Sequence, residues 1–269
     1  MLFQNKNKSR FKQSGSHAER PRLRQDSPFS ITEAYNSIRT KLIFTGKGEK
    51  CPVFAVTSPL ASDGKSTVAV SLAVSIAMAK QRVLLIDADM RKPSVHRYFN
   101  TESRDGLSEI LAGLNSEIKL RSTDVEYLSI LTAGQIPPNP AELLGLSQMD
   151  TLLDYARQYF DYVIIDTPPV NIVTDSSVIA DKITGYLMVV QSGKNHMQDV
   201  SDAVQQIEEM NGNIVGIILN DPENKTTAHY SYRYNKYYRY NRYKYYGDGT
   251  GNSSGSSSGS SSGKTESKK

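Results

Sequence analysis

The segment VFAVTSPLASDGKSTVAVSLAVSIAMAK (residues 53–80) joins an apolar, β-branched run to a long helical pattern through a polar loop. The first six residues have the composition of a buried strand, and the last sixteen repeat Ala, Val, Leu and Ile on a helical face. The loop between them, TSPLASDGKST (57–67), places Gly64, Lys65 and Ser66 at the start of the helix. A strand that leads through such a loop into a helix is the context in which a phosphate-binding loop is credible.

The same alternation of strand and helix continues along the chain. The predicted strands are residues 53–58, 82–87, 127–131, 162–166, 186–191 and 214–220, all expected to be buried, and the clearest helical patterns are residues 65–80, 147–160 and 196–211. This order predicts an α/β fold with a doubly wound, mostly parallel sheet of the P-loop NTPase type and helices on both faces. In such sheets, ligands bind at the carboxyl ends of the strands.

A further helix is predicted before the first strand, at residues 31–45, with Ser30 as its N-cap and Glu33 at the capping-box spacing. Composition sets the remaining boundaries: a disordered basic segment at 1–28, one domain at 29–222 that includes this helix, a flexible tyrosine-rich segment at 223–246, and a disordered Gly/Ser tail at 247–269. The chain has one cysteine and no apolar run that suggests a signal peptide or a membrane span, so we expect a cytoplasmic protein.

The loop at 57–67 fits the G-x-x-x-x-G-K-[ST] pattern except at its first glycine, where Pro59 stands. Lys65 is expected to neutralise charge on the β and γ phosphates, and the Ser66 hydroxyl is expected to ligate Mg²⁺. The nucleotide-binding residues predicted from this pattern are Ser62, Asp63, Gly64, Lys65, Ser66 and Thr67. Asn220, after the last strand, would contact adenine if it acts as in related P-loop ATPases, or it would serve only as a turn residue. ATP and Mg²⁺ are the expected cofactors.

Acidic residues follow two of the other strands. Asp87 and Asp89 lie two residues apart after the second strand, with Arg91 next in the same register, and Asp166 ends the strand VIID. Each carboxylate alone could merely cap a turn. Beside a phosphate loop, however, they predict a magnesium site and a proton acceptor.

Five segments together resemble the bacterial tyrosine kinases (BY-kinases): TSPLASDGKST, LLIDADMRKP, VIIDTPP, GQIPPNPAELL (134–144) and a tyrosine-rich stretch near the C-terminus. The chain is similar to the Gram-positive form, in which the kinase is a protein separate from its membrane-bound activator. The resemblance implies an ATP-dependent, autophosphorylating protein-tyrosine kinase that regulates capsular or exopolysaccharide synthesis and export. Its implied partners are a membrane-bound adaptor of the polysaccharide co-polymerase type, which recruits it to the inner face of the membrane, and a cognate tyrosine phosphatase.

The resemblance also implies roles for single residues. Lys65 and Ser66 would bind the phosphates and Mg²⁺, Asp87 would orient or deprotonate the attacking tyrosine, and Asp89 and Asp166 would hold the metal through waters. Tyrosine has an ordinary pKa near 10, so a carboxylate within hydrogen-bond reach would help it to attack. Arg91 would either stabilise phosphoryl charge or pair with one of the two metal-binding aspartates.

Two departures from the family pattern matter. Ala61, Ser62 and Asp63 precede Gly64 where the family commonly has Pro-Gly-Glu, so the loop is expected to differ in shape. The family's first helix commonly carries E-x-x-R-x-x-R, which packs neighbouring subunits into a ring. Here Glu33 and Arg39 match, but Asn36 occupies the middle position and cannot make a bidentate charged contact. Homo-oligomerisation as a ring is therefore left open.

The stretch YSYRYNKYYRYNRYKYY (230–246), here called the tyrosine cluster, holds five Lys or Arg and no acid. The predicted autophosphorylation sites are its nine tyrosines: Tyr230, Tyr232, Tyr234, Tyr237, Tyr238, Tyr240, Tyr243, Tyr245 and Tyr246. A flexible tether of about 20 residues spans roughly 25 Å, which gives effective concentrations on the order of millimolar at an active site.

Two other functions compete with this interpretation. A partitioning-type P-loop switch ATPase would share the fold, but such proteins usually carry an additional lysine early in the loop, and residues 58–63 contain none. A basic, aromatic tail could also hold nucleic acid by charge and stacking. With the kinase motifs present, no nucleic acid partner is expected.

Overall fold

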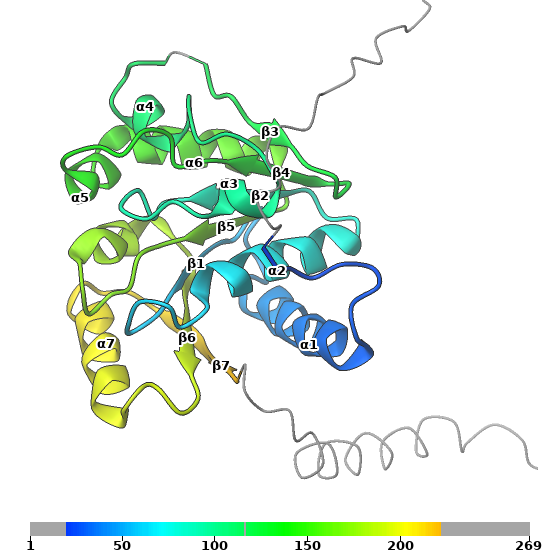
Figure 1. Cartoon of the computed structure of the whole chain (residues 1–269). Helices are drawn as coiled ribbons and strands as arrows, with labels where there is room; N and C mark the ends of the chain where they lie inside the picture. The colour runs from blue at the N-terminus through cyan, green and yellow to red at the C-terminus, as the bar shows by residue number, and fades with distance from the viewer. Residues whose placement is uncertain (1–19, 116, 222–269) are drawn as a thin grey trace, which may run out of the picture. The chain divides into compact units, whose positions relative to one another are not determined.

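The computed structural model describes residues 20–115 and 117–221. Its elements follow the order α1 (Phe29–Thr45), β1 (Val53–Thr57), α2 (Lys65–Met78), β2 (Val83–Asp87), α3 (Val95–Tyr98), α4 (Leu107–Leu111), β3 (Arg121–Ser122), β4 (Leu128–Leu131), α5 (Pro140–Leu144), α6 (Ser147–Tyr159), β5 (Tyr162–Asp166), the 3₁₀ segment η1 (Thr174–Lys182), β6 (Gly185–Gln191), α7 (Met197–Glu209) and β7 (Ile214–Asn220). Figure 1 shows these elements by label.

The strands form one sheet in the order β3-β4-β2-β5-β1-β6-β7. Every neighbouring pair is parallel except β3 with β4. The predicted mostly parallel α/β sheet is therefore confirmed. The sequence missed β3 because two residues are too short to show a strand pattern.

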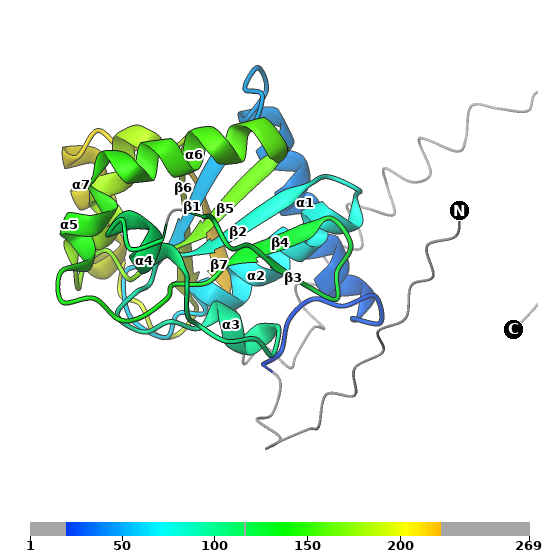
Figure 2. The same cartoon turned by 90° about the horizontal axis from the view of Figure 1, so that it is seen from above.

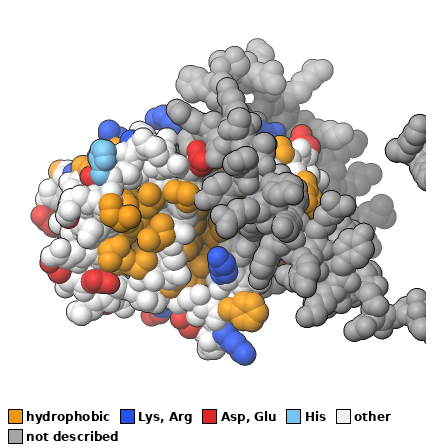
Figure 3. Space-filling view, turned by 90° about the horizontal axis from the view of Figure 1, so that it is seen from below, with side chains coloured by type: hydrophobic (Ala, Val, Ile, Leu, Met, Phe, Trp, Pro, Cys, Tyr) orange, Lys and Arg blue, Asp and Glu red, His pale blue; other side chains and the backbone are white. Residues whose placement is uncertain are grey.

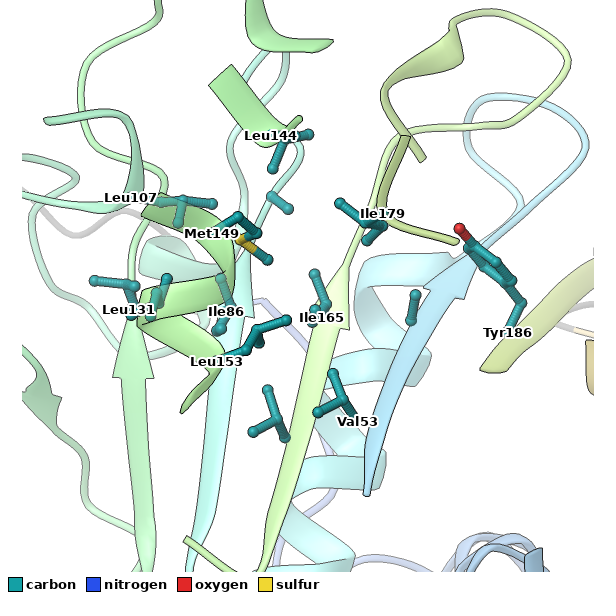
Figure 4. Close-up of a cluster of buried hydrophobic side chains, with 14 of the residues drawn as sticks. Val53, Ile86, Leu107, Leu131, Leu144, Met149, Leu153, Ile165, Ile179 and Tyr186 are labelled. Atoms are coloured by element: carbon teal, nitrogen blue, oxygen red, sulfur yellow. The ribbon is translucent and has the colours of Figure 1, made fainter. Parts of the chain in front are cut away.

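Helices cover both faces of this sheet, as predicted (Figure 2). On one face, α4, α5, α6, α7 and η1 contribute to one buried apolar cluster, in which Met149 and Leu153 of α6 lie over Ile86 and Ile165 of the sheet (Figure 4). On the other face, α1, α2 and α3 contribute to a second cluster. The two clusters fix the strands in place, so the loops at their carboxyl ends project from a rigid base.

The segment before α1 packs on the domain, which corrects the predicted disorder for its described part, residues 20–28. Leu23 is buried and its N–H donates to Ser71 Oγ of α2 at 3.1 Å. Arg22 Nε donates to the Tyr98 carbonyl at 3.2 Å, and its guanidinium pairs with Asp124. One apolar side chain and one arginine thus anchor a segment whose overall composition is polar, and composition alone cannot reveal such anchors.

The start of α1 also differs from the prediction. Its N-cap is Pro28, whose carbonyl accepts from the N–H groups of Ile31 and Thr32, so the helix includes Ser30 instead of beginning after it. Asn36, at the position where the family has arginine, binds within the chain. Its amide donates to Glu33 at 2.9 Å, while Arg39 donates to the Ser75 carbonyl of α2 at 2.6 Å. The contact between Asn36 and Glu33 lies within α1, whereas Arg39 connects α1 to α2.

The last strand, β7, is not buried as predicted. It forms an end of the sheet, and Ile217 and Leu219 are 55% and 64% exposed. Figure 3 views the side on which α7 and β7 lie in Figure 1 and shows a hydrophobic area there. An edge strand has a neighbour on one side only, so an apolar sequence does not guarantee burial. Within the described part of the chain, no helix is long and apolar enough to cross a membrane.

Candidate active site at the phosphate loop

The loop between β1 and α2 depends on Gly64. This residue has φ 92°, a left-handed conformation that favours glycine, and a Cβ atom here would collide with the side-chain amide of Asn220. Within the described part of the chain, no side chain caps the N-terminus of α2, so the first N–H groups of this helix can meet an anion. Beside the loop lies a cavity of ≈ 610 Å³, here called the phosphate cavity, whose lining includes Ser62, Gly64, Lys65, Ser66, Thr67 and Asp89.

Asp63 is not one of the residues that line this cavity, and its side chain joins the loop to the segment that follows β6. Its carboxylate is fully buried and accepts from the Leu60 N–H at 2.9 Å, from Lys194 Nζ at 2.8 Å and from Asn195 Nδ2 at 3.0 Å. Lys194 also donates to the Ala61 carbonyl. The Asp63 carbonyl in turn accepts from Asn220 Nδ2 at 2.9 Å. Asp63 therefore shapes the loop, and its predicted contact with the nucleotide stays a prediction, as does that of Asn220.

We expect Lys194→Met to weaken ATP binding about tenfold or more, because the loop would lose charge-assisted hydrogen bonds, each of which contributes about 1.5–3 kcal/mol. Titration with a fluorescent ATP analogue measures this effect. Lys182→Met is the matched control, since Lys182 also pairs with a carboxylate at 2.8 Å, that of Asp150, on another part of the domain. Equal affinities in the two variants would show that the contact with Asp63 does not shape the loop.

The Lys65 side chain lies between carboxylates of two other strand ends. Its ammonium is 2.7 Å from Asp89 Oδ2 and 3.4 Å from Asp166 Oδ1, and all three side chains are at most 9% exposed. Burial alone would lower the pKa of Lys65, but the charges of Asp166 and Asp89 outweigh it and raise that pKa. The residue therefore stays a cation in the neutral range, as phosphate binding requires.

Asp87 and Asp166 face one another across neighbouring strands, since they are register partners in β2 and β5. Asp87 Oδ2 accepts from the N–H groups of Ser94 and Val95, both at 2.9 Å. Within the described residues, Asp87 Oδ1 and Asp166 Oδ2 are buried and have no hydrogen-bond partner. Burial, followed by the charge of Asp166, raises the pKa of Asp87 to about 7. Burial also raises the pKa of Asp166.

Arg91 pairs with a residue that the sequence did not indicate. Its guanidinium makes a bidentate contact with Asp175 of η1, both bonds at 2.8 Å, so neither Asp89 nor Asp166 is its hydrogen-bond partner. Arg91 nevertheless lines the phosphate cavity. No motif marks Asp175, which lies 84 residues further along the chain. Lys194 could have been suspected, because it follows the carboxyl end of β6, where ligand-contacting loops gather.

The residues predicted to hold Mg²⁺ offer a suitable set of ligands. Ser66, Asp89 and Asp166 supply a hydroxyl and two carboxylates, the oxygen ligands that this ion prefers. The unpaired oxygen of Asp166 supports the fit. Among the residues described, no three Asp, Glu, His or Cys side chains are placed to hold a metal directly. The tyrosine cluster lies outside the described residues.

Comparison with known proteins identifies the family. A family model described as ParA, NUBPL iron-transfer P-loop NTPase, matches residues 52–235. The chain is 34% identical over 210 residues to the putative tyrosine-protein kinase CapB of Staphylococcus aureus, which covers 77% of this chain and 92% of that protein. It is 36% identical over 223 residues to the tyrosine-protein kinase YwqD of Bacillus subtilis, covering 82% and 94%.

Solved structures agree with these relatives. The kinase domain of the Escherichia coli tyrosine kinase ETK superposes with a TM-score of 0.72 at 35% identity, covering 79% of this chain and 85% of that one. The chimerical protein CapA2B2 superposes with a TM-score of 0.68 at 36% identity, covering 72% and 85%. The sequence comparison and the structure comparison therefore indicate the same family.

Proposed function

The chain belongs to the bacterial tyrosine kinases within the P-loop NTPases, and from this premise we propose that it phosphorylates the tyrosine cluster of its own sequence. The observation that carries the proposal is the buried group of Lys65, Asp87, Asp89 and Asp166 beside the phosphate loop. One cation and a carboxylate with a pKa near 7 are the two groups that phosphoryl transfer to a phenol needs.

In the proposed reaction, the phenolic oxygen of a tyrosine attacks the γ-phosphorus of ATP. A new P–O bond forms as the bond between this phosphorus and the β–γ bridging oxygen breaks, and ADP leaves with that electron pair. The phenolic proton passes to Asp87, whose Oδ1 has no hydrogen-bond partner among the described residues. Lys65 binds the phosphate oxygens, and the loop N–H groups fix their position. Arg91, held by Asp175, stabilises the charge of the transferring group at the cavity wall.

Ser66, Asp89 and Asp166 would hold Mg²⁺ beside the phosphates, and the ion would supply further charge neutralisation there. Lys65 now contacts both carboxylates. Nucleotide binding would draw the ammonium toward the phosphates and free these carboxylates for the ion. The adenine would lie near Asn220, at the far side of the loop.

The biological setting proposed is regulation of capsular or exopolysaccharide synthesis and export. A membrane-bound adaptor would bring the cytoplasmic kinase to the inner face of the membrane, and a cognate phosphatase would reverse the modification. The chimera named CapA2B2 supports the adaptor, because its name joins an A component to a B component and its chain is 36% identical to this one. With the adaptor acting as the activator, we expect low activity from the kinase alone and higher activity when the adaptor's cytoplasmic segment is added.

The testing experiment incubates the full chain with γ-labelled ATP and Mg²⁺, alone and with the cytoplasmic segment of a candidate adaptor, and then maps the phosphorylated residues. The control is a chain with all nine cluster tyrosines replaced by phenylalanine. Label between residues 230 and 246 that is absent from the control supports the proposal. ATP hydrolysis without tyrosine label under either condition would favour a switch ATPase of the partitioning type.

A further inference from the structure

A second cavity lies next to the phosphate cavity and has a different chemistry. It has a volume of ≈ 440 Å³ and is here called the apolar cavity, after its lining residues Leu114, Ile136, Pro137, Pro138, Leu143 and Leu146. Pockets of roughly 300–1,000 Å³ commonly hold a small organic group. It is formed where α4 and α5 pack together (Figure 2), beside the loop that leaves β4.

Ile136 belongs to the walls of both cavities. It is 66% exposed, as expected for a side chain that forms a ridge between two hollows. Since β4 neighbours β2, whose end carries Asp87, the apolar cavity lies one strand away from the proposed proton acceptor. A group bound in the apolar cavity would therefore be close to a tyrosine at the phosphate cavity.

The floor of the apolar cavity is preformed. Glu109 of α4 is 7% exposed, and its carboxylate accepts from the Gly106 N–H at 3.0 Å, Ser108 Oγ at 2.8 Å and the Gln135 N–H at 3.1 Å. Gly134 has φ 83°, and a Cβ atom there would collide with this carboxylate. Two consecutive prolines then stiffen the wall. A rigid apolar site loses little entropy when a flat side chain binds.

We infer that the apolar cavity binds an aromatic side chain of the acceptor segment, two residues from the tyrosine that receives the phosphoryl group, so that the kinase selects paired tyrosines. The occupant is the tyrosine cluster, and this inference rests on the proposed function. Side chains two residues apart on an extended chain lie on one side, roughly 7 Å from each other. The cluster contains four such pairs: Tyr230 with Tyr232, Tyr232 with Tyr234, Tyr238 with Tyr240, and Tyr243 with Tyr245.

Charge supports the same occupant. The lining of the apolar cavity includes Glu142, which is exposed and receives one bond from Asn139 at 3.0 Å. Among the residues that the structure describes, the lining contains no lysine or arginine, whereas the tyrosine cluster carries five and no acid. A tyrosine ring would cover the leucines and prolines, while a neighbouring cation of the segment would face Glu142.

The test uses two synthetic peptides of residues 230–246 in which Tyr238 is the acceptor and all tyrosines other than Tyr238 and Tyr240 are serine. One peptide carries Tyr240→Phe and the other carries Tyr240→Ser. In a second set Tyr240 is the acceptor, and position 238 carries Tyr238→Phe in one peptide and Tyr238→Ser in the other. The enzyme is the full chain with its nine cluster tyrosines replaced by serine, so that each peptide is the sole cluster acceptor. We expect the phenylalanine peptide to have a KM about tenfold lower at a similar kcat, from burial of one ring.

Enzyme variants locate this preference. In the double variant Leu114→Ser with Leu146→Ser, the KM values of the two peptides should become equal. The rate of ATP hydrolysis without peptide should be unchanged. Both leucines are exposed, at 75% and 39%, so the changes leave the core intact. Met210→Ser, an exposed apolar residue at the end of α7, is the matched control and should retain the tenfold preference.

Fluorescence anisotropy of labelled peptides with ADP present separates the two proposals. Equal KM values for both peptides in both orders, with phosphotyrosine formed, would overturn the aromatic site and leave the kinase function intact. Tighter binding of the phenylalanine peptide that is lost with the leucine changes, but without phosphotyrosine, would support the site and contradict the proposed acceptor. A preference that survives the leucine changes would place the aromatic group elsewhere and overturn the inference.

Discussion

Lys65→Met should reduce phosphoryl transfer to tyrosine by about 10²–10³-fold, the loss typical when one positioned donor to a developing charge is removed. Lys65 is the cation between Asp89 and Asp166, and the loop from residue 58 to 63 supplies no other lysine. The measurement is single-turnover transfer from γ-labelled ATP at saturating nucleotide, which separates chemistry from ATP affinity. Lys41→Met is the control, because Lys41 is an exposed lysine of α1.

The same substitution should also change how stability depends on pH. The pKa of Lys65 is raised, so its contribution is fully present below the ordinary lysine pKa and is lost only as the pH passes the higher folded value. Without the ammonium, two buried carboxylates lose their partner, a change that costs about 3–5 kcal/mol. Protonation of Asp166, whose pKa burial raises, would relieve part of this cost. The variant should therefore be closer to the parent at pH 5 than at pH 8 in urea unfolding, and equal losses at both pH values would contradict this account of the site.

The sequence predicts those features that are formed by residues close together in the chain. The order of apolar runs and helical patterns predicted the sheet, and the loop at 57–67 predicted Lys65 at the start of a helix, because strand, loop and helix are consecutive in the chain. The position of Asp166 at the end of an apolar strand was equally local, and its register with Asp87 follows from parallel pairing.

Contacts between distant segments could not be predicted in the same way. Lys194 pairs with Asp63, which lies 131 residues away in the sequence. Arg91 pairs with Asp175 and not with Asp89 or Asp166, the two partners considered from the sequence. Which acid pairs with each of these basic residues depends on the side chains that the folded loops bring within contact distance. The sequence alone does not distinguish between the charged residues of those loops. Burial of Leu23 and exposure of β7 depend likewise on what the rest of the chain covers.

Asp87→Asn should lower the rate of tyrosine phosphorylation by about 10²–10⁴-fold, the usual contribution of a positioned general base. In the parent protein, the rate should rise with pH through about 7, because Asp87 must be ionised to accept the phenolic proton and its pKa is raised to about 7. The pH profile of kcat/KM for peptide phosphorylation measures this. The residual activity of the variant should lack that rise, and a profile unchanged from the parent would exclude Asp87 as the base.

Asp87→Asn should lower activity but raise the free energy of unfolding. This combination distinguishes a catalytic base from a residue with only a structural role. A folded pKa near 7 against an ordinary 3.8 means that Asp87 favours folding while it is protonated, and that this advantage is lost as the pH rises toward the folded value. Such a shift corresponds to about 4 kcal/mol. Asparagine has no charge to bury, and its carbonyl can still accept from the N–H groups of Ser94 and Val95.

Asp87→Asn should therefore unfold at a higher urea concentration than the parent at pH 8, while the two should nearly coincide at pH 4. Asp154→Asn, at an exposed aspartate of α6, should show neither effect. If Asp87→Asn were instead less stable at pH 8, the carboxylate would be held by a favourable charged partner. Its unpaired oxygen would then not be the acceptor that the reaction requires. Loss of activity together with a gain of stability is the result expected of a charge that is kept in a buried site for catalysis.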